Sequence, residues 1–150
     1  MRSKGFDMPK VELTWKDGMR FEGTPDSGHT ITMDSDKAHD GSDMGARPME
    51  LLLVGLGGCT GMDVVSILKK MRKHIKDFHV TIAAERAAEH PKVYSTIALE
   101  YVLEGDMDEK DVERAIGLSQ EKFCSASAML GKTARITYSY KLLKTGAKTT

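Results

Sequence analysis

The sequence predicts an α+β fold with the element order βββ-α-ββ-α-α-β. Three observations lead to this prediction. Apolar and polar side chains alternate in the first third of the chain, a long apolar stretch follows Pro48, and alternating stretches return on both sides of a second helical region. Alternation with a period of two is typical of half-buried strands, whereas apolar residues three to four apart indicate a helix. Antiparallel meanders of strands around a central helix favour the α+β class.

Three strands are expected in the first third of the chain. The odd-numbered residues of 11–16 are apolar and the even-numbered ones are polar. Asp17-Gly18 then has the composition of a hairpin turn, and a second turn is expected at 25–28. These signals together predict a three-stranded antiparallel meander. Its strands are 11–16, 19–24 and 29–34.

A long central helix is expected over 48–74, after a polar loop at 35–47. Pro48 fits its first turn, where no N–H is needed, and Glu50 favours the helix dipole. The first half is apolar on nearly all sides, which predicts that it is buried. Glycines inside a helix each cost about 1 kcal/mol relative to alanine. We therefore expect close packing of a second helix, or access for a ligand, at Gly55, Gly57, Gly58 and Gly61.

The second half of the chain is expected to hold two long strands, a helical region and a last strand. The two long strands are joined near His90-Pro91. Asp108 and Asp111 have the spacing of a capping box at the start of a helix, and Gly131 ends a second, short helix. The predicted elements are strands 78–89, 93–104 and 135–142 and helices 109–122 and 125–130.

Composition and charge restrict the function. The 150 residues suit one domain, 1–150, with polar ends at 1–8 and 144–150 that we expect to be frayed. Twenty-two basic residues balance 22 acidic ones, which argues against a nucleic-acid partner. We find neither the apolar run of a signal peptide nor a membrane-spanning stretch. A soluble cytoplasmic protein is therefore expected, and cysteines there are free thiols, metal ligands or a redox pair.

The two cysteines are the main candidates for chemistry. Cys59 lies among the glycines of the central helix, where it is either a thiol in an open pocket or a small buried filler. Cys124 lies where one helix ends and another begins. The N–H groups of a helix start favour a thiolate, but a buried filler is again the alternative. No short spacing links the two cysteines, so the sequence alone does not place them together.

Other polar residues give weaker signals. Asp63 lies one turn after Cys59 on the same helix face, where it could organise hydrogen bonds around the thiol or simply be a solvated aspartate. The five histidines are scattered, and none has metal-ligand spacing with a cysteine. We therefore predict no metal and no other cofactor.

Two segments resemble a known family. Residues 47–66, with Gly57-Gly58-Cys59-Thr60-Gly61 at their centre, resemble the central helix of the OsmC/Ohr superfamily of organic hydroperoxide reductases, in particular its YhfA-like branch. Residues 118–125, which contain Cys124, resemble the second cysteine motif of that family. The resemblance covers nearly the whole chain.

The resemblance implies both a fold and an activity. The fold would be the OsmC-like one, an intertwined homodimer with a long buried central helix and a site at the subunit interface. Cys59 would be the peroxidatic thiol that attacks an organic hydroperoxide, and Cys124 would resolve the resulting sulfenic acid. A small dithiol of lipoyl type would then restore the thiols.

The sequence departs from the pattern of the family's peroxidases at two places. Their glutamate directly follows the helix-opening proline, where this chain has Met49, and Glu50 is one step later. An arginine beside the first hairpin turn stabilises their thiolate, and here Lys16 and Arg20 are the candidates. The alternative function is therefore a non-catalytic ligand-binding or redox-sensing protein, and a third is a structural dimer with inert cysteines.

Overall fold

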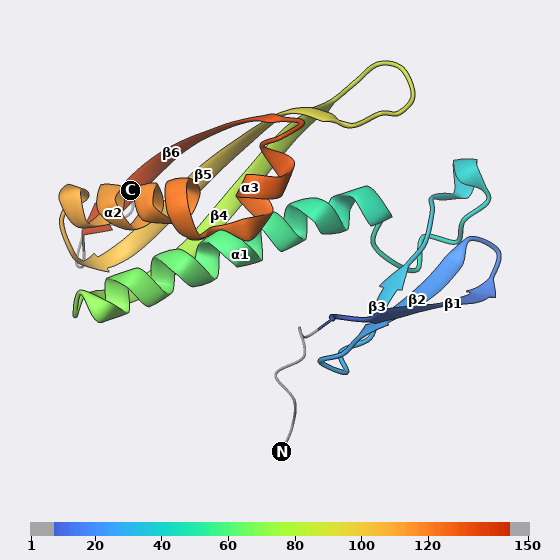
Figure 1. Cartoon of the computed structure of the whole chain (residues 1–150), viewed down its shortest axis with the longest axis horizontal. Coiled ribbons are helices and arrows are strands. Elements are labelled where there is room, and N and C mark those ends of the chain that lie inside the picture. Colours follow the sequence, from blue (N-terminus) through green and yellow to red (C-terminus); the bar gives the residue numbers. More distant parts are fainter. Residues whose placement is uncertain (1–7, 145–150) are drawn as a thin grey trace. The chain divides into compact units, whose positions relative to one another are not determined.

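The computed structural model describes residues 8–144. The predicted order βββ-α-ββ-α-α-β is confirmed, with a 3-10 helix and a π-helix added. The chain divides into two compact units, Met1–Leu52 and Leu53–Thr150, which are considered one at a time; Figure 1 labels their elements. A single domain over 1–150 stays a prediction. The predicted frayed ends 1–7 and 145–150 lie outside the described residues.

The N-terminal unit holds the predicted antiparallel meander. Its strands pair in the order β1-β2-β3, and Gly18 supplies the left-handed backbone of the first turn, with φ of 48°. The expected loop at 35–47 contains the 3-10 helix η1. Asp34 organises this loop because the N–H groups of Ser35, Ser42 and Met44 donate to its carboxylate. The elements are β1 (Val11–Asp17), β2 (Arg20–Pro25), β3 (Ile31–Met33) and η1 (Lys37–His39).

The central helix α1 (Pro48–Lys70) begins where predicted and ends four residues early. At its start the carboxylate of Glu50 accepts a hydrogen bond from the N–H of Arg47, 2.9 Å long. At its end Arg72 adopts a left-handed backbone, with φ of 60°, and His74 already pairs with Asp106 in a sheet. The prediction of a helix to 74 was wrong because sheet pairing starts within the basic stretch that read as a helix end.

Only one stripe of α1 is buried within the chain, so the prediction that the whole first half of this helix is buried was wrong. Val54 and Met62, on other faces, remain 66% and 76% exposed. The helix also has a mean hydropathy of 1.9 over 18 residues, so by length and composition it could span a bilayer, contrary to our expectation. Core helices of soluble proteins share those properties. The buried stripe is Leu56, Thr60, Val64 and Leu68.

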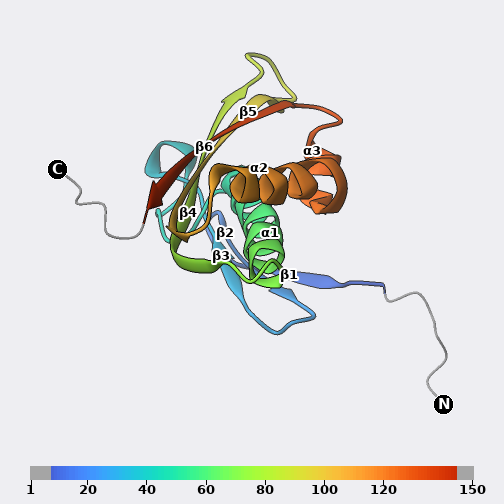
Figure 2. The same cartoon turned by 90° about the vertical axis from the view of Figure 1, so that its left-hand side faces the viewer.

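The C-terminal unit is a three-stranded sheet with helices on one face (Figures 1 and 2). β4 and β5 pair antiparallel as predicted, whereas β6 pairs parallel with β5. The sequence predicts no direction for the last strand. It is parallel because the helices between β5 and β6 return the chain to the other end of the sheet before β6 begins. The strands are β4 (His74–Arg86), β5 (Tyr94–Asp106) and β6 (Arg135–Lys144).

The helical region between β5 and β6 contains a break that the sequence did not predict. The predicted capping box of Asp108 and Asp111 is present, with both hydrogen bonds 3.0 Å long. The helix expected over 109–122 instead divides into an α-helix and a π-helix. Lys144 belongs to the last strand, so the expectation that it is frayed was wrong. The helices are α2 (Glu109–Leu118), η2 (Ser119–Phe123) and α3 (Ser125–Leu130).

Candidate functional site

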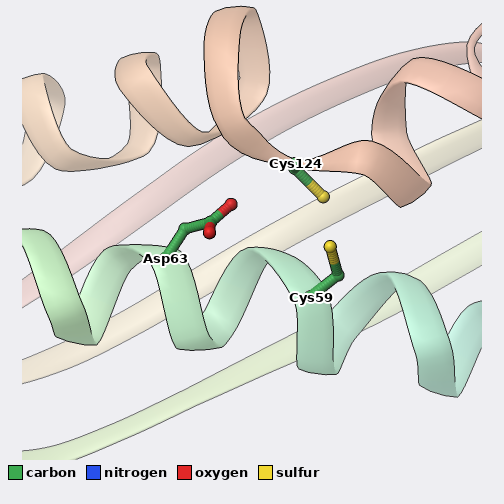
Figure 3. A group of neighbouring side chains, drawn as sticks. All are labelled: Cys59, Asp63 and Cys124. Carbon is green, nitrogen blue, oxygen red and sulfur yellow. The ribbon is translucent and has the colours of Figure 1, made fainter. Parts of the chain in front are cut away.

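The fold brings Cys59, Asp63 and Cys124 together. The two sulfurs and a carboxylate oxygen all lie within 4.8 Å of one another. Figure 3 shows the sulfurs pointing toward each other, one from α1 and one from the segment before α3, with Asp63 beside them. Both cysteines are free thiols. A disulfide needs an S–S distance of about 2.05 Å, so the two sulfurs must approach further before they can bond.

Two local structures position the three side chains. Cys59 and Asp63 are four residues apart on α1, so both point in nearly the same direction. Cys124 directly follows η2, whose wide turn is closed by a 2.7 Å hydrogen bond from the N–H of Cys124 to the carbonyl of Ser119. Cys124 then caps α3, and its sulfur accepts a hydrogen bond from the N–H of Ser127 at 3.3 Å.

The two thiols differ in exposure. Cys59 is half-buried, whereas Cys124 is only 3% exposed. Burial raises the pKa of Cys124, and the hydrogen bond from Ser127 and the neighbouring Cys59 act in opposite directions on it. The expected hydrogen bond at the helix start is therefore present, but burial outweighs it. Cys124 is held as a neutral thiol.

A buried hydrogen-bond network ends at Asp63. The hydroxyl of Ser119 donates to Oδ2 of Asp63 at 3.0 Å. The Thr60 hydroxyl lies 2.7 Å from the hydroxyls of both Ser119 and Tyr101. The side-chain amide of Gln120 donates to Thr60 and to Tyr101, at 3.1 and 2.8 Å. We call Tyr101, Gln120, Thr60 and Ser119 the hydroxyl network.

The directions of these hydrogen bonds follow from the number of protons available. Ser119 gives its one hydroxyl proton to Asp63, so Thr60 must donate to Ser119, and Tyr101 must donate to Thr60. Burial raises the pKa of Tyr101, which keeps its phenol protonated as this direction requires. The network is therefore a one-way series of donors directed at the carboxylate of Asp63.

The other predicted site residues belong to the N-terminal unit and have partners there. Lys16 pairs with Glu22 at 3.3 Å, and Arg20 pairs with Asp17 at 2.7 Å. The Nε of Arg20 is buried, and it has no hydrogen-bond partner among residues 8–144. Glu50 is engaged as the cap of α1. It stays a prediction that the thiolate is stabilised, or the substrate bound, by Lys16, Arg20 or Glu50.

The glycines of α1 have different surroundings. A Cβ at Gly57 would lie 2.8 Å from the Ile82 side chain, so this glycine allows close packing of β4. Gly55 and Gly58 have open space where a side chain would extend. Gly58 lines an apolar groove of about 460 Å³ between α1 and β4. Contact with Ile82 therefore explains why Gly57 is tolerated despite its cost in helix stability. No contact within the described part of the chain gives such an explanation for Gly55 or Gly58.

The sequence prediction missed the four residues of the hydroxyl network. Two signals could have indicated them. Thr60 directly follows Cys59, and Ser119 and Gln120 lie inside the second cysteine motif. Tyr101 gave no such signal, because an aromatic residue in a strand is more simply explained by packing.

Comparisons with known proteins agree with this fold. The model of the OsmC-like protein family matches residues 39–139. Protein YhfA of Escherichia coli strain K12 is 38% identical over 135 residues, which cover 89% of this chain and 98% of that protein. The crystal structure of a hypothetical protein from Aquifex aeolicus VF5 is 36% identical, with a TM-score of 0.82 and coverage of 93% of this chain and 98% of that one. An organic hydroperoxide resistance protein from Elizabethkingia anophelis is 15% identical and shares the fold, with a TM-score of 0.71 over 93% of this chain and 99% of that one.

With the matched family model covering most of the chain, and with a full-length relative at 38% identity, the chain belongs to the OsmC-like protein family.

Proposed function

We propose that this protein is a thiol-dependent peroxidase for organic hydroperoxides, with Cys59 as the peroxidatic thiol and Cys124 as the resolving thiol. The observation that carries the proposal is the approach of the two thiols to within 4.8 Å from distant segments of the chain. The name of the structurally similar Elizabethkingia protein, an organic hydroperoxide resistance protein, points the same way. A cytoplasmic location and a small dithiol reductant of lipoyl type complete the proposal.

The chemistry divides into three balanced steps. The Cys59 thiolate attacks the peroxide, the O–O bond breaks, and the alcohol leaves with a proton while the sulfur becomes a sulfenic acid. The Cys124 thiol attacks that sulfenic sulfur, and water leaves as the disulfide forms. A dithiol reductant then exchanges with the disulfide, restoring both thiols and becoming oxidised itself.

Burial supports this assignment of roles. The half-buried Cys59 is the more accessible thiol to a substrate from solvent. Cys124 is buried and its pKa is raised, so at rest it is a poor nucleophile. A resolving thiol needs to react only after its partner is oxidised, and its partner lies within reach.

We also propose that the working form is a homodimer. Apolar side chains of α1 that the chain leaves exposed include Val54 and Met62, and the open positions at Gly55 and Gly58 lie on the same helix. Exposed apolar patches of this kind mark interaction surfaces. A second copy of α1 would cover them and would offset the cost of these glycines.

The test is peroxidase activity of the metal-free protein with an alkyl hydroperoxide and a dithiol. Wild type should turn over repeatedly and Cys59→Ser should be inactive. Without the dithiol, Cys124→Ser should consume one equivalent of peroxide and stop at the sulfenic acid. Ser125→Ala, an exposed neighbour of Cys124, is the matched control and should behave as wild type. Equal rates in Cys59→Ser and wild type would refute the proposal.

The candidate cations are tested in the same assay. If Arg20 serves the thiolate, Arg20→Lys should slow the first step more than Lys16→Arg does, because lysine lacks the bidentate guanidinium. Equal rates in both variants and wild type would remove these two residues from the site.

One observation favours a second candidate function, a non-catalytic ligand-binding or redox-sensing protein. The carboxylate of Glu50 is used as the cap of α1, and Met49 stands where the family's peroxidases have their acid. This candidate predicts slow stoichiometric oxidation of the thiols without turnover. Sustained turnover would exclude it.

A further inference from the structure

We propose that the reduced pair Cys59 and Cys124, together with Asp63, forms a binding site for Zn²⁺. The site is present when the thiols are reduced and is lost when they are oxidised to a disulfide. Two thiolates and one carboxylate supply three ligands, and water takes the fourth position. Three protein ligands plus one water is the arrangement of an open tetrahedral zinc site. The sequence did not suggest such a site, because its ligands come from segments that lack metal-ligand spacing.

The first argument is geometric. The three candidate ligand atoms already lie within 4.8 Å of one another. Around a tetrahedral Zn²⁺, with bonds of about 2.0–2.3 Å, neighbouring ligand atoms are roughly 3.5–3.8 Å apart. Figure 3 shows the two sulfurs directed at each other and Asp63 on the neighbouring turn of α1. Contraction of about 1 Å, within the reach of side-chain rotation, completes the set.

The second argument is that both outer ligands are already held by hydrogen-bond donors. The N–H of Ser127 donates to the Cys124 sulfur, and Ser119 donates to Oδ2 of Asp63. In the described part of the chain Oδ1 of Asp63 accepts no such bond, so one carboxylate oxygen remains available as a ligand. Donors that orient the ligands are a general property of metal sites, and their loss weakens binding about tenfold to a hundredfold.

The third argument is charge. Three anionic ligands in a half-buried place would repel one another. A divalent cation balances their charge, so it favours loss of the proton that the buried Cys124 thiol otherwise keeps. Thiolate ligands select Zn²⁺ over the hard cations Mg²⁺ and Ca²⁺. Zn²⁺ also has no redox chemistry of its own. Each thiol loses its proton to solvent when the metal binds, and no electrons are transferred.

The consequence is mutual exclusion between metal and oxidation. An organic hydroperoxide oxidises the two thiols to a disulfide and is itself reduced to an alcohol and water. The disulfide has no thiolate left to bind Zn²⁺, and bound Zn²⁺ occupies the sulfur that would attack the peroxide. Binding itself is independent of the proposed peroxidase function. Only its effect as an inhibitor of turnover rests on that function.

The experiment measures binding directly. Reduced protein, protein oxidised to the disulfide, and variants are titrated with Zn²⁺ against a chromophoric chelator. We expect one Zn²⁺ per chain in the reduced wild type and none at that site after oxidation. Loss of a ligand in Cys59→Ser, Cys124→Ser or Asp63→Asn should weaken binding by more than the tenfold to hundredfold that we expect for Ser119→Ala.

The matched control is Asp77→Asn, an exposed aspartate on β4, which should bind as wild type does. Co²⁺ in place of Zn²⁺ should give the absorption of a tetrahedral thiolate complex, which scattered histidines cannot produce. Circular dichroism of each variant checks that it is folded.

Two results would overturn the site: reduced wild type that binds Zn²⁺ no better than Cys59→Ser and Cys124→Ser do, or Asp63→Asn that binds as tightly as wild type. The outcome is separate from that of the peroxidase assay, which uses metal-free protein. Zinc binding without turnover refutes only the proposed function, and turnover without zinc binding refutes only this site.

Discussion

Thr60 is the residue on which the hydroxyl network depends. Its side chain is fully buried and contacts three other members through hydrogen bonds. Thr60→Val keeps the shape but leaves buried polar partners unsatisfied, which costs about 1–3 kcal/mol. We expect urea denaturation to show this loss in the free energy of unfolding. Thr81→Val, at an exposed position on β4, makes the same chemical change and should cost nothing. Equal stability of both variants would show that the network does not stabilise the fold.

The two thiols should also differ in their reaction with iodoacetamide. Because Cys59 is half-buried and Cys124 is nearly fully buried, alkylation of the native, reduced, metal-free protein should label Cys59 several times faster. Timed labelling and peptide mass spectrometry measure both rates. In urea the two rates should become equal, which shows that the difference arises from the fold. Faster labelling of Cys124 in the native protein would contradict the assignment of the two roles.

At the scale of elements, the start of α2 makes stability depend on acid pH. Hydrogen bonds from the backbone N–H of Asp108 and from Lys73 hold the pKa of Asp111 below its ordinary value. Because the pKa of Asp111 is lower in the folded than in the unfolded protein, its ionised form stabilises the native state at pH values above the unfolded pKa. That stability is lost as the pH falls through the folded pKa. Wild type should therefore lose stability as the pH falls below the ordinary aspartate pKa of about 4. Asp111→Asn should be less stable at pH 6 and less sensitive over the acid range. Parallel curves for the two proteins would contradict this.

The sequence was sufficient for the strands and α-helices, but insufficient for the direction of β6 and for the π-helix. Alternation, turn residues and caps located every strand and all three α-helices, because these signals are local. The parallel pairing of β6 was missed because alternation gives the face of a strand and not its direction. The π-helix was missed because residues 109–122 have a continuous helical pattern. Its wide turn is stabilised by contacts to Thr60 and Tyr101, which are remote in sequence.

The candidate site was predicted to a similar extent. Cys59, Cys124 and Asp63 were identified from their residue types and motifs. Their approach to one another followed only from the folded chain, because no short spacing links the two thiols. Ser119 and Thr60 were not identified, because serine and threonine are common in helices and their role depends on which partner lies opposite.

At the scale of the whole molecule, a chain with no net charge and an exposed apolar helix face has little to prevent self-association. Val54→Asp places a charge on that face at a position that is 66% exposed in the single chain. We expect sedimentation to show a dimer for wild type and a monomer for Val54→Asp. Val93→Asp, the same change at another exposed valine, should remain dimeric. A monomeric wild type would refute the homodimer.

The wide turn of η2 changes the direction in which the Cys124 side chain points relative to that of Ser119. In a regular α-helix, residues five apart point in directions that differ by roughly 140°. In η2 the hydrogen bond from the N–H of Cys124 to the carbonyl of Ser119 places Cys124 directly above Ser119 along the helix axis. Ser119 therefore bonds to Asp63 while Cys124 lies next to Cys59. An insertion or deletion of one residue between them would rotate the thiol away without changing any residue at the site. The spacing between Ser119 and Cys124 is therefore as much a part of the thiol pair as the cysteines are.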